Sequence, residues 1–190
     1  MKKYFCMLLI SACACVFPFR TAAAATASNK YLITEKGVGD FVLGERIPAA
    51  EGFEITEEIW SGGEGEDETV YVVSEKGEKA LEIMPDYPEE TVIFEIMIFS
   101  DGFHTEEGIK VGAALEDLVR AYPQYSLWYT YISDMFVFDA EGRSGTQFLL
   151  DGESFAGKQD LYSGDSVQLS LEDFKPGTKI TSIRIYRIGE

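Results

Sequence analysis

Few side chains in this sequence could carry out nucleophilic or metal-dependent chemistry. The three cysteines, Cys6, Cys13 and Cys15, all lie in an apolar N-terminal stretch, and His104 is the only histidine. A nucleophile–histidine–acid triad would have to recruit His104, and no Gly-x-Ser-x-Gly motif surrounds a serine. The thiols or paired imidazoles of a zinc site and the glycine-rich loop of a nucleotide site are also missing. We therefore predict no enzymatic activity, no metal and no cofactor, and we interpret His104 as a solvated loop residue.

Carboxylates are abundant, and they are the remaining candidates for chemistry. Residues 61–68 place four carboxylates and three glycines between two extended runs, and Ca²⁺ binds to oxygen ligands supplied by flexible loops. The alternating Asp/Asn series of a Ca²⁺ loop is absent, so the pattern favours a charged hairpin tip that keeps a strand end soluble. Cation binding at residues 64–68, from Glu64 to Glu68, stays open as an alternative. Two carboxylates from distant strands could also converge as a glycosidase pair, which leaves a carboxylate-based hydrolase as a further alternative.

Aromatic residues supply the best candidates for a binding surface. In the run from Leu127 to Ile132, alternation places Tyr129 and Tyr131 on one face of a strand and Trp128 on the other. One of these faces must cover the core; if the other is exposed, its rings form a rigid platform for a protein partner or a sugar. Trp60, beside the acidic loop, could join the same surface in a folded sheet. The usual burial of large aromatic residues favours the alternative that these rings pack in the core.

The N-terminal segment has the features of an export signal. Met1 to Lys3 form a basic start, an apolar stretch follows, and Ala25-Thr26-Ala27 fits the small-x-small rule for cleavage. We predict a signal peptide over residues 1–27, and hence a protein exported to the periplasm or cell envelope. A second possibility is a lipobox at residues 10–13, which would place a lipid anchor on Cys13 and hold the protein at a membrane. The apolar stretch is too short to be a permanent membrane span.

Length and charge restrict what the remaining chain can be and bind. Residues 28–190 have the size of one domain and can bury a core without disulfides. The sequence has 16 Lys and Arg against 33 Asp and Glu, a net charge of −17. Three of the basic residues lie in the leader, so the predicted mature chain is more acidic still. Such a surface makes nucleic acid and anionic lipid poor partners, and it leaves cations, basic proteins and neutral ligands.

The mature chain is predicted to be a series of strands with one helix. Residues 91–99 combine β-branched and aromatic residues on both alternating sets, which is typical of a central strand covered on two faces. Gly77 favours a tight antiparallel hairpin between the extended runs at residues 69–74 and 79–84. The further runs with strand character are residues 54–60, 69–74, 79–84, 126–132, 135–139, 146–150 and 179–188.

One helix is predicted, and it belongs to a pattern that occurs twice. Residues 113–122 carry an apolar stripe at helical spacing and end at Pro123. The glycine–aliphatic stretch before this helix resembles residues 37–44, and four extended runs follow each copy. We therefore predict an α+β fold, mostly antiparallel, in which residues 31–100 and 101–190 duplicate one helix-plus-four-strand meander. In the first copy Pro48 and Gly52 leave room for one turn of helix at most.

This arrangement resembles the tandem modules of β-lactamase-inhibitor-protein-like domains, which small outer-membrane assembly lipoproteins share. Residues 37–44 and 105–122 are also similar to small, stress-regulated envelope lipoproteins of Gram-negative bacteria. The resemblance implies an α+β fold with antiparallel sheet and a role in binding.

From these observations we expect an exported, non-enzymatic binding or envelope-structural protein. The expected partner is a protein, of basic charge, recognised by a sheet face that bears the candidate residues Trp60, Trp128, Tyr129 and Tyr131. Carbohydrate binding through the same aromatic residues is the alternative function, and a carboxylate-based hydrolase is the third.

Overall fold

A computed structural model describes residues 29–61, 67–88 and 90–188. The predicted signal peptide, the lipobox cysteine and residues 62–66 of the acidic loop lie outside the described residues. Within the described part, no helix is long and apolar enough to cross a membrane.

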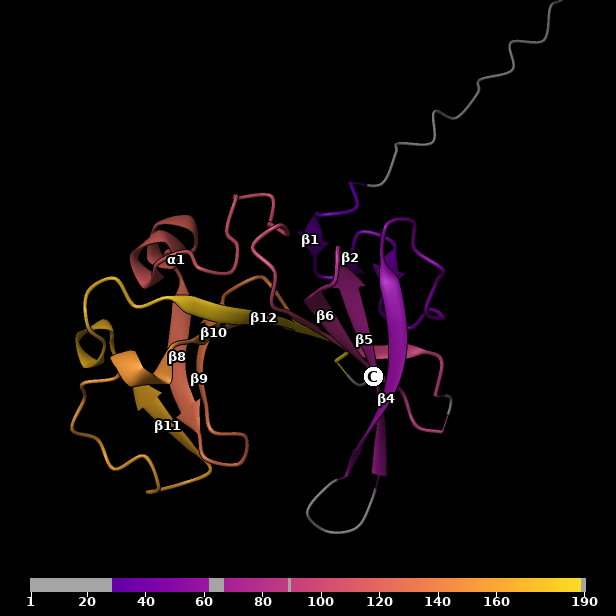
Figure 1. The fold of residues 1–190 in the computed structure, drawn as a ribbon. Helices are drawn as coiled ribbons and strands as arrows, with labels where there is room; N and C mark the ends of the chain where they lie inside the picture. The colour runs from indigo at the N-terminus through magenta and orange to yellow at the C-terminus, as the bar shows by residue number, and fades with distance from the viewer. Residues whose placement is uncertain (1–28, 62–66, 89, 189–190) are drawn as a thin grey trace, which may run out of the picture.

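Nine strands form one antiparallel sheet, which is the frame of the molecule (Figure 1). Their order across the sheet is β11-β8-β9-β10-β12-β7-β6-β5-β4. The strands are β4 (Glu54–Ser61), β5 (Asp67–Glu75), β6 (Glu78–Pro85), β7 (Ile93–Ile98), β8 (Tyr125–Thr130), β9 (Met135–Ala140), β10 (Thr146–Leu150), β11 (Ser166–Leu169) and β12 (Ile180–Tyr186).

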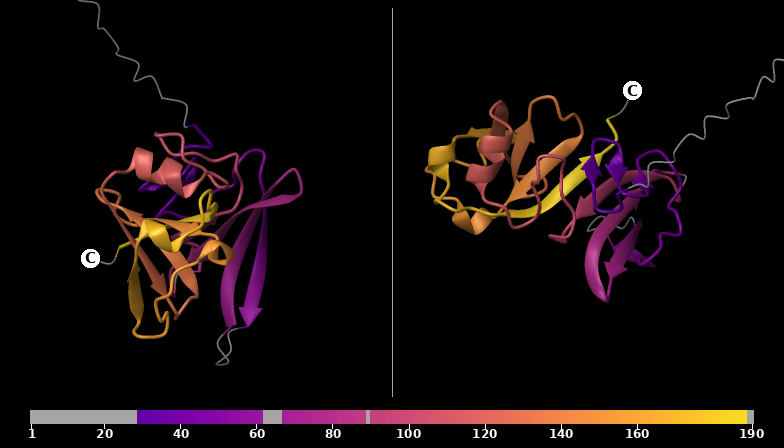
Figure 2. Two further views of the ribbon diagram at one scale, coloured as in Figure 1. Left: turned by 90° about the vertical axis from the view of Figure 1, so that its left-hand side faces the viewer. Right: turned by 90° about the horizontal axis from the view of Figure 1, so that it is seen from above.

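The sheet consists of two runs of consecutive neighbours that meet in its middle. From β4 to β7 each strand pairs with the next one in the chain, and the same holds from β8 to β10. β12 then pairs with β10 on one side and with β7 on the other, whereas β11 returns to the edge beside β8. Figure 2 shows the two groups of strands with β12 running between them. The β7–β12 pair is therefore the sheet contact that joins the halves.

One face of the sheet forms the hydrophobic core. Cross-strand partners point to the same side of a sheet, and successive registers place a row of buried apolar residues on this side. The row runs through Ile98, Ile183, Phe148, Phe138 and Leu127, all at most 2% exposed. The central position predicted for residues 91–99 is confirmed, because β7 lies next to the middle of the sheet. Its second face carries Glu95 and Met97, and the predicted cover on both faces is not found among the described elements.

The core face is covered by α1 (Leu115–Ala121) and by a small three-stranded sheet (Figure 1). The ring of Tyr122, just after the helix, lies 5.5 Å from that of Phe148. The small sheet contains β1 (Ile33–Thr34), β2 (Gly37–Val38) and β3 (Phe41–Val42), and its buried residues belong to the same core. Two 3₁₀ turns, η1 (Gly152–Ser154) and η2 (Leu171–Asp173), are followed by phenylalanines that pack on Phe136 of the same face.

The predicted helix at residues 113–122 is confirmed as α1. Leu115 and Leu118 are buried against the core, as the apolar stripe requires. Tyr122 closes the last turn and Pro123 follows it, where proline cannot continue the helix. The predicted hairpin turn is confirmed as well, since Lys76 and Gly77 both have positive φ angles, 56° and 83°, between paired Glu75 and Glu78.

The predicted antiparallel α+β fold is found, but the predicted duplication over residues 31–100 and 101–190 is not shown. Residues 45–53 form no helix: Pro48 has no N–H to give to a helix, and Gly52 takes a positive φ of 83° that ends a regular turn. The described residues therefore show a mostly antiparallel β protein with one short helix, and not two helix-plus-meander modules.

Candidate functional site

The second face of the large sheet carries charged and polar side chains where a core would be apolar. Side chains that point away from the core row belong to this face. In register across the middle of the sheet lie Glu82, Met97, Arg184, Gln147 and Asp139. We call this surface the polar face and define it by six side chains from six strands: Glu82, Glu95, Arg184, Gln147, Asp139 and Trp128.

The centre of the polar face is an ion pair. Arg184 Nη2 on β12 donates to Glu95 Oε2 on β7 at 2.6 Å, and Nη1 donates to Gln147 Oε1 on β10 at 3.3 Å. The guanidinium also lies 4.9 Å from the ring centroid of Tyr186. Its third nitrogen, Nε, is buried and has no hydrogen-bond partner among the described residues. Arg184 is thus held in one position without being fully satisfied.

A second ion pair lies on β6. Lys79 Nζ donates to Glu82 Oε1 at 2.7 Å and lies 4.0 Å from the ring centroid of Phe99. Glu82 is 9% exposed, whereas the Lys79 side chain is 45% exposed. The carboxylate is therefore sheltered within the face and its cation reaches solvent.

Trp128 lies at the far side of the polar face on β8. Its indole Nε1–H donates to Asp139 Oδ2 on β9 at 2.6 Å. This bond uses the one polar atom of the side chain and fixes the orientation of the ring. Trp128 is half-buried, so part of the ring is open to solvent.

The polar residues of this face are unusually sheltered for an uncovered sheet surface. Glu95 and Gln147 are each 5% exposed, yet α1, the small sheet and both 3₁₀ turns pack on the opposite face. In Figure 1 the outer strands on both sides run away from the end of the molecule that carries α1 and β1. The two halves of the sheet thus diverge on the side of the polar face, and the described helix, small sheet and 3₁₀ turns all pack on the other side.

Tyr129 is not part of any exposed platform, and this corrects the expected binding surface. It is 2% exposed, packs 4.8 Å from Phe136 between ring centroids, and belongs to the core. A hydrogen bond from its hydroxyl to Asp134 at 2.7 Å, together with burial, raises the pKa of Tyr129 to about 12. Alternation defines two faces, and the core row takes the one that contains Leu127.

The other two candidate aromatic residues are exposed but lie far apart in the sheet. Tyr131 follows β8, is 46% exposed, and donates from its hydroxyl to Asp165 at 3.4 Å. Trp60 is 39% exposed on β4. Its register through Glu58, Val70 and Val72 places it on the same side of the sheet as Glu82. Trp60 and Trp128 thus share a face at opposite ends of the strand order.

His104 has a structural role that its polar surroundings in the sequence do not indicate. Its backbone pairs with the first strand: Ile33 N donates to His104 O at 2.8 Å, and His104 N donates to Tyr31 O at 3.0 Å. The ring is half-buried, with Nδ1 3.1 Å from Thr105 O. Among the residues that the structure describes, no group of three or more His, Cys, Asp or Glu side chains could hold a metal ion.

Comparison with known proteins gives a relationship in fold. No family model matches the chain, and no curated protein matches it. Among solved structures, the uncharacterized protein yfeY from Escherichia coli matches with a TM-score of 0.59 at 17% sequence identity. The two proteins are similar in fold. The match covers 82% of this chain and 99% of that chain, so the likeness extends over both sheet halves. This match names no family, and the resemblance to β-lactamase-inhibitor-protein-like domains and small envelope lipoproteins stays a prediction.

Sequence reasoning missed the charged centre of the polar face. Glu95 sits in the apolar run of β7 and Arg184 sits among isoleucines in β12. A lone charge inside an otherwise apolar strand is the signal that could have revealed them, because ionic groups are seldom buried unless they are paired. Their pairing depends on the β7–β12 contact, which joins residues 89 positions apart.

Proposed function

We propose that this chain is an exported, non-enzymatic binding protein that recognises a basic protein partner through the polar face. The observation that carries the proposal is the row of paired charges on the uncovered side of the sheet. Burying ions costs free energy that pairing only partly offsets, and a row of apolar residues would stabilise a sheet at least as well. Oriented charges on an uncovered surface are suited to recognition, because they need little rearrangement when a partner arrives.

The chemistry of the partner follows from charge. On the polar face the carboxylates of Glu82, Glu95 and Asp139 outnumber the cations of Arg184 and Lys79 that pair with them, and the whole chain carries −17. Such a field attracts basic proteins and speeds their association, and it disfavours acidic ones. Trp128 supplies the rigid aromatic contact that commonly dominates interface energies.

The resolved pKa shifts of the carboxyls give the hydrolase alternative no support. A carboxylate-based hydrolase needs one carboxyl whose pKa is raised, so that it can act as the acid near neutral pH. Hydrogen bonds lower the pKa of Glu75, Glu116 and Asp117, and they outweigh the opposing effect of burial at Glu107 and Asp173. None of these shifts prepares a general acid.

The two tryptophans of the chain allow a direct test. In a Trp60→Phe protein, Trp128 is the only tryptophan and reports on the polar face; in a Trp128→Phe protein, Trp60 reports on the β4–β5 hairpin. Basic and acidic proteins of similar size are titrated into each. We expect the basic protein to shift the Trp128 emission, and Asp139→Asn to weaken this response several-fold. No response of Trp128 to any basic protein would contradict the proposal.

The same titration separates the carbohydrate alternative. A tryptophan ring beside a carboxylate, as in Trp128 and Asp139 at 2.6 Å, can stack on a sugar while an oxygen accepts from its hydroxyls. Neutral glycans that shift the Trp128 emission independently of salt would favour this function. A response to basic protein that weakens as salt rises would favour the protein partner.

We also propose export by cleavage after residue 27, with a lipid anchor on Cys13 as the alternative. The mass of the mature N-terminus, measured on protein from the producing cell, separates the two. A chain beginning near residue 28 supports cleavage, and a diacylglyceryl adduct on Cys13 contradicts it.

We infer further that the two sheet halves descend from a duplication whose first copy lost its helix. The support is a pair of equivalent hydrogen bonds. Gly44 N donates to Ile93 O, in the first residue of β7, at 2.8 Å, and Gly112 N donates to Ile180 O, in the first residue of β12, at 2.9 Å. Each of these strands is the last of its meander, and both glycines have φ near +80°.

A further inference from the structure

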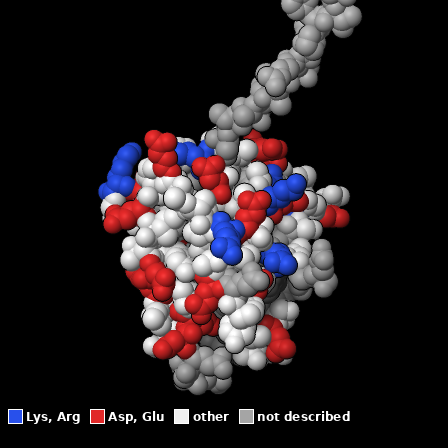
Figure 3. All heavy atoms as spheres, turned by 90° about the vertical axis from the view of Figure 1, so that its right-hand side faces the viewer, with Lys and Arg blue, Asp and Glu red and all other residues white. Residues whose placement is uncertain are grey.

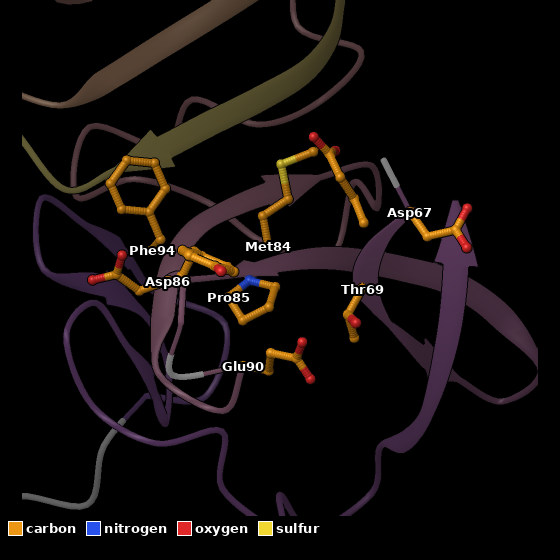
Figure 4. A pocket seen from close by; sticks show the side chains of 9 residues that line it. Asp67, Thr69, Met84, Pro85, Asp86, Glu90 and Phe94 are labelled. Carbon is orange, nitrogen blue, oxygen red and sulfur yellow. The ribbon is translucent and has the colours of Figure 1, made fainter. Parts of the chain in front are cut away.

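A surface hollow of about 690 Å³ lies where β5 begins and β6 ends. Figure 4 shows the side chains around it: Phe94 and Asp86 on one side, Thr69 and Asp67 on the hairpin side, and Met84 and Pro85 between them. Its volume falls within the range of about 300–1,000 Å³ that ligand pockets occupy. The hollow is therefore large enough to take several side chains of a partner.

The lining of the hollow exposes large apolar groups that folding would normally bury. Tyr87 is 90% exposed and Phe94 is 37% exposed. Trp60, 39% exposed, pairs across the hairpin with Glu68, which lines the hollow. Aromatic and apolar side chains that gather at one hollow and are surrounded by polar groups mark interaction sites on soluble proteins.

The charges around these apolar groups select the occupant. Asp67, Glu68, Asp86 and Glu90 all line the hollow. Of these four carboxylates, only Asp86 forms an ion pair within the described residues, with Arg187 at 3.2 Å. Figure 3 shows this side of the molecule: red carboxylates occur over the whole view, and the blue cations lie in its upper and middle parts. Carboxylates beside aromatic rings attract a cation both as ion-pair partners and through the ring faces.

Glu90, in one wall of the hollow, is held in place through its backbone. Tyr71 on β5 donates from its hydroxyl to the backbone oxygen of Glu90 at 3.0 Å. Burial and the charges of Glu57 and Glu90 raise the pKa of Tyr71, so the hydroxyl keeps its proton and the bond. The wall is thus prearranged for a ligand, which reduces the entropy lost on binding.

We propose that this hollow binds an extended basic peptide segment, with a Lys or Arg side chain among the carboxylates and an apolar neighbour against Tyr87 and Phe94. The hollow borders the polar face, because its Met84 is the cross-strand partner of Glu95. None of the six side chains that define the polar face lines the hollow, so variants of the hollow test this proposal separately from the proposed function.

The test uses the Trp128→Phe protein, in which Trp60 is the only tryptophan, and two fluorescein-labelled hexapeptides. One alternates lysine with leucine and the other alternates glutamate with leucine. We expect the lysine peptide to bind by anisotropy and to change the Trp60 emission, and the glutamate peptide to do neither. In the double variant Glu68→Gln/Glu90→Gln, and separately in Tyr87→Ala, binding should weaken roughly 10-fold, as the loss of about 1.4 kcal/mol implies.

The matched control is Glu106→Gln/Glu153→Gln, which removes the same charge from exposed positions away from the hollow. It should weaken binding by less than about 2-fold, since exposed charges at a distance are screened by salt. Tyr87, Glu68 and Glu90 are exposed, so these variants should keep the wild-type unfolding midpoint. Equal weakening in control and test variants, or equal binding of both peptides, would overturn the proposal. Binding seen only by Trp128 in the Trp60→Phe protein would place the peptide on the polar face instead.

Discussion

Arg143 Nη2 donates to Glu107 Oε2 at 2.5 Å, and this pair fastens the loop before α1 to the loop between β9 and β10. The same carboxylate oxygen accepts from the hydroxyl of Tyr122 at 2.7 Å. The guanidinium lies 5.1 Å from the Tyr122 ring centroid. Three residues from separate parts of the second half are thus joined at one carboxylate, above the core ring of Tyr122.

This cluster predicts an acid-sensitive contribution to stability. Burial acts to raise the pKa of Glu107, but hydrogen bonds from Arg143 and Tyr122 outweigh it and lower the pKa to about 2. A lowered folded-state pKa stabilises the protein above the ordinary value of 4.5, and this contribution is lost as the pH falls from there toward 2. The Glu107 side chain is 36% exposed, so we expect only about 1–2 kcal/mol after solvent screening.

Urea unfolding of wild type and Glu107→Gln at several pH values measures this contribution. We expect the variant to be less stable at pH 7 by the stated amount and the two proteins to converge near pH 2. A constant difference across this range would show that Glu107 acts by packing and not by its charge.

The ion pair between Glu95 and Arg184 predicts a large effect of breaking it and a small effect of replacing it. Arg184→Met leaves the Glu95 carboxylate, 5% exposed, without its partner, and we expect a loss of about 2–4 kcal/mol. The double variant Glu95→Leu/Arg184→Met should recover most of this, because no buried charge remains. A double-mutant cycle by urea unfolding checks both. Additive losses would show that the two residues do not interact.

Three glycines predict unequal costs of adding one methyl group. A Cβ on Gly37, whose φ is 146°, would lie 2.0 Å from the backbone oxygen of Phe41, and this oxygen cannot move without breaking the small sheet. Gly37→Ala should therefore cost more than about 3 kcal/mol. Gly44 and Gly112 have open space or only the Arg187 side chain nearby, so alanine there should cost about 1 kcal/mol through the positive φ alone. Thermal unfolding of the three variants is the measurement. If the two halves arose by the proposed duplication, Gly44→Ala and Gly112→Ala should shift the midpoint alike.

Tyr129 and Tyr131 are two residues apart, but truncation should destabilise the protein only at Tyr129. Tyr129→Ala removes a core ring and should lower the unfolding midpoint by roughly 10 °C. Tyr131→Ala removes an exposed ring and should leave the midpoint almost unchanged. Calorimetry of the two variants decides this. Loss of partner binding in folded Tyr131→Ala would add Tyr131 to the binding surface.

The local elements of this protein could be predicted because their causes are local. The helical spacing before Pro123 determined α1, the positive φ available to Gly77 determined the β5–β6 turn, and the β-branched run at residues 91–99 determined the central strand. Each depends on neighbouring residues and on backbone sterics. The scarcity of thiols and imidazoles likewise limited the available chemistry before any fold was known. By contrast, β1 to β3 have two residues each, too few to show a periodicity.

Only the tertiary structure decided which side of each strand faces the core. Alternation places Trp128 and Tyr129 on opposite faces but does not say which face is buried. That depends on which face α1 and the small sheet cover. The same holds for Glu95 and Arg184, which meet because β12 pairs with β7 across 89 positions of chain. Pairing over such distances depends on the whole set of packed elements, and no local sequence window contains that information.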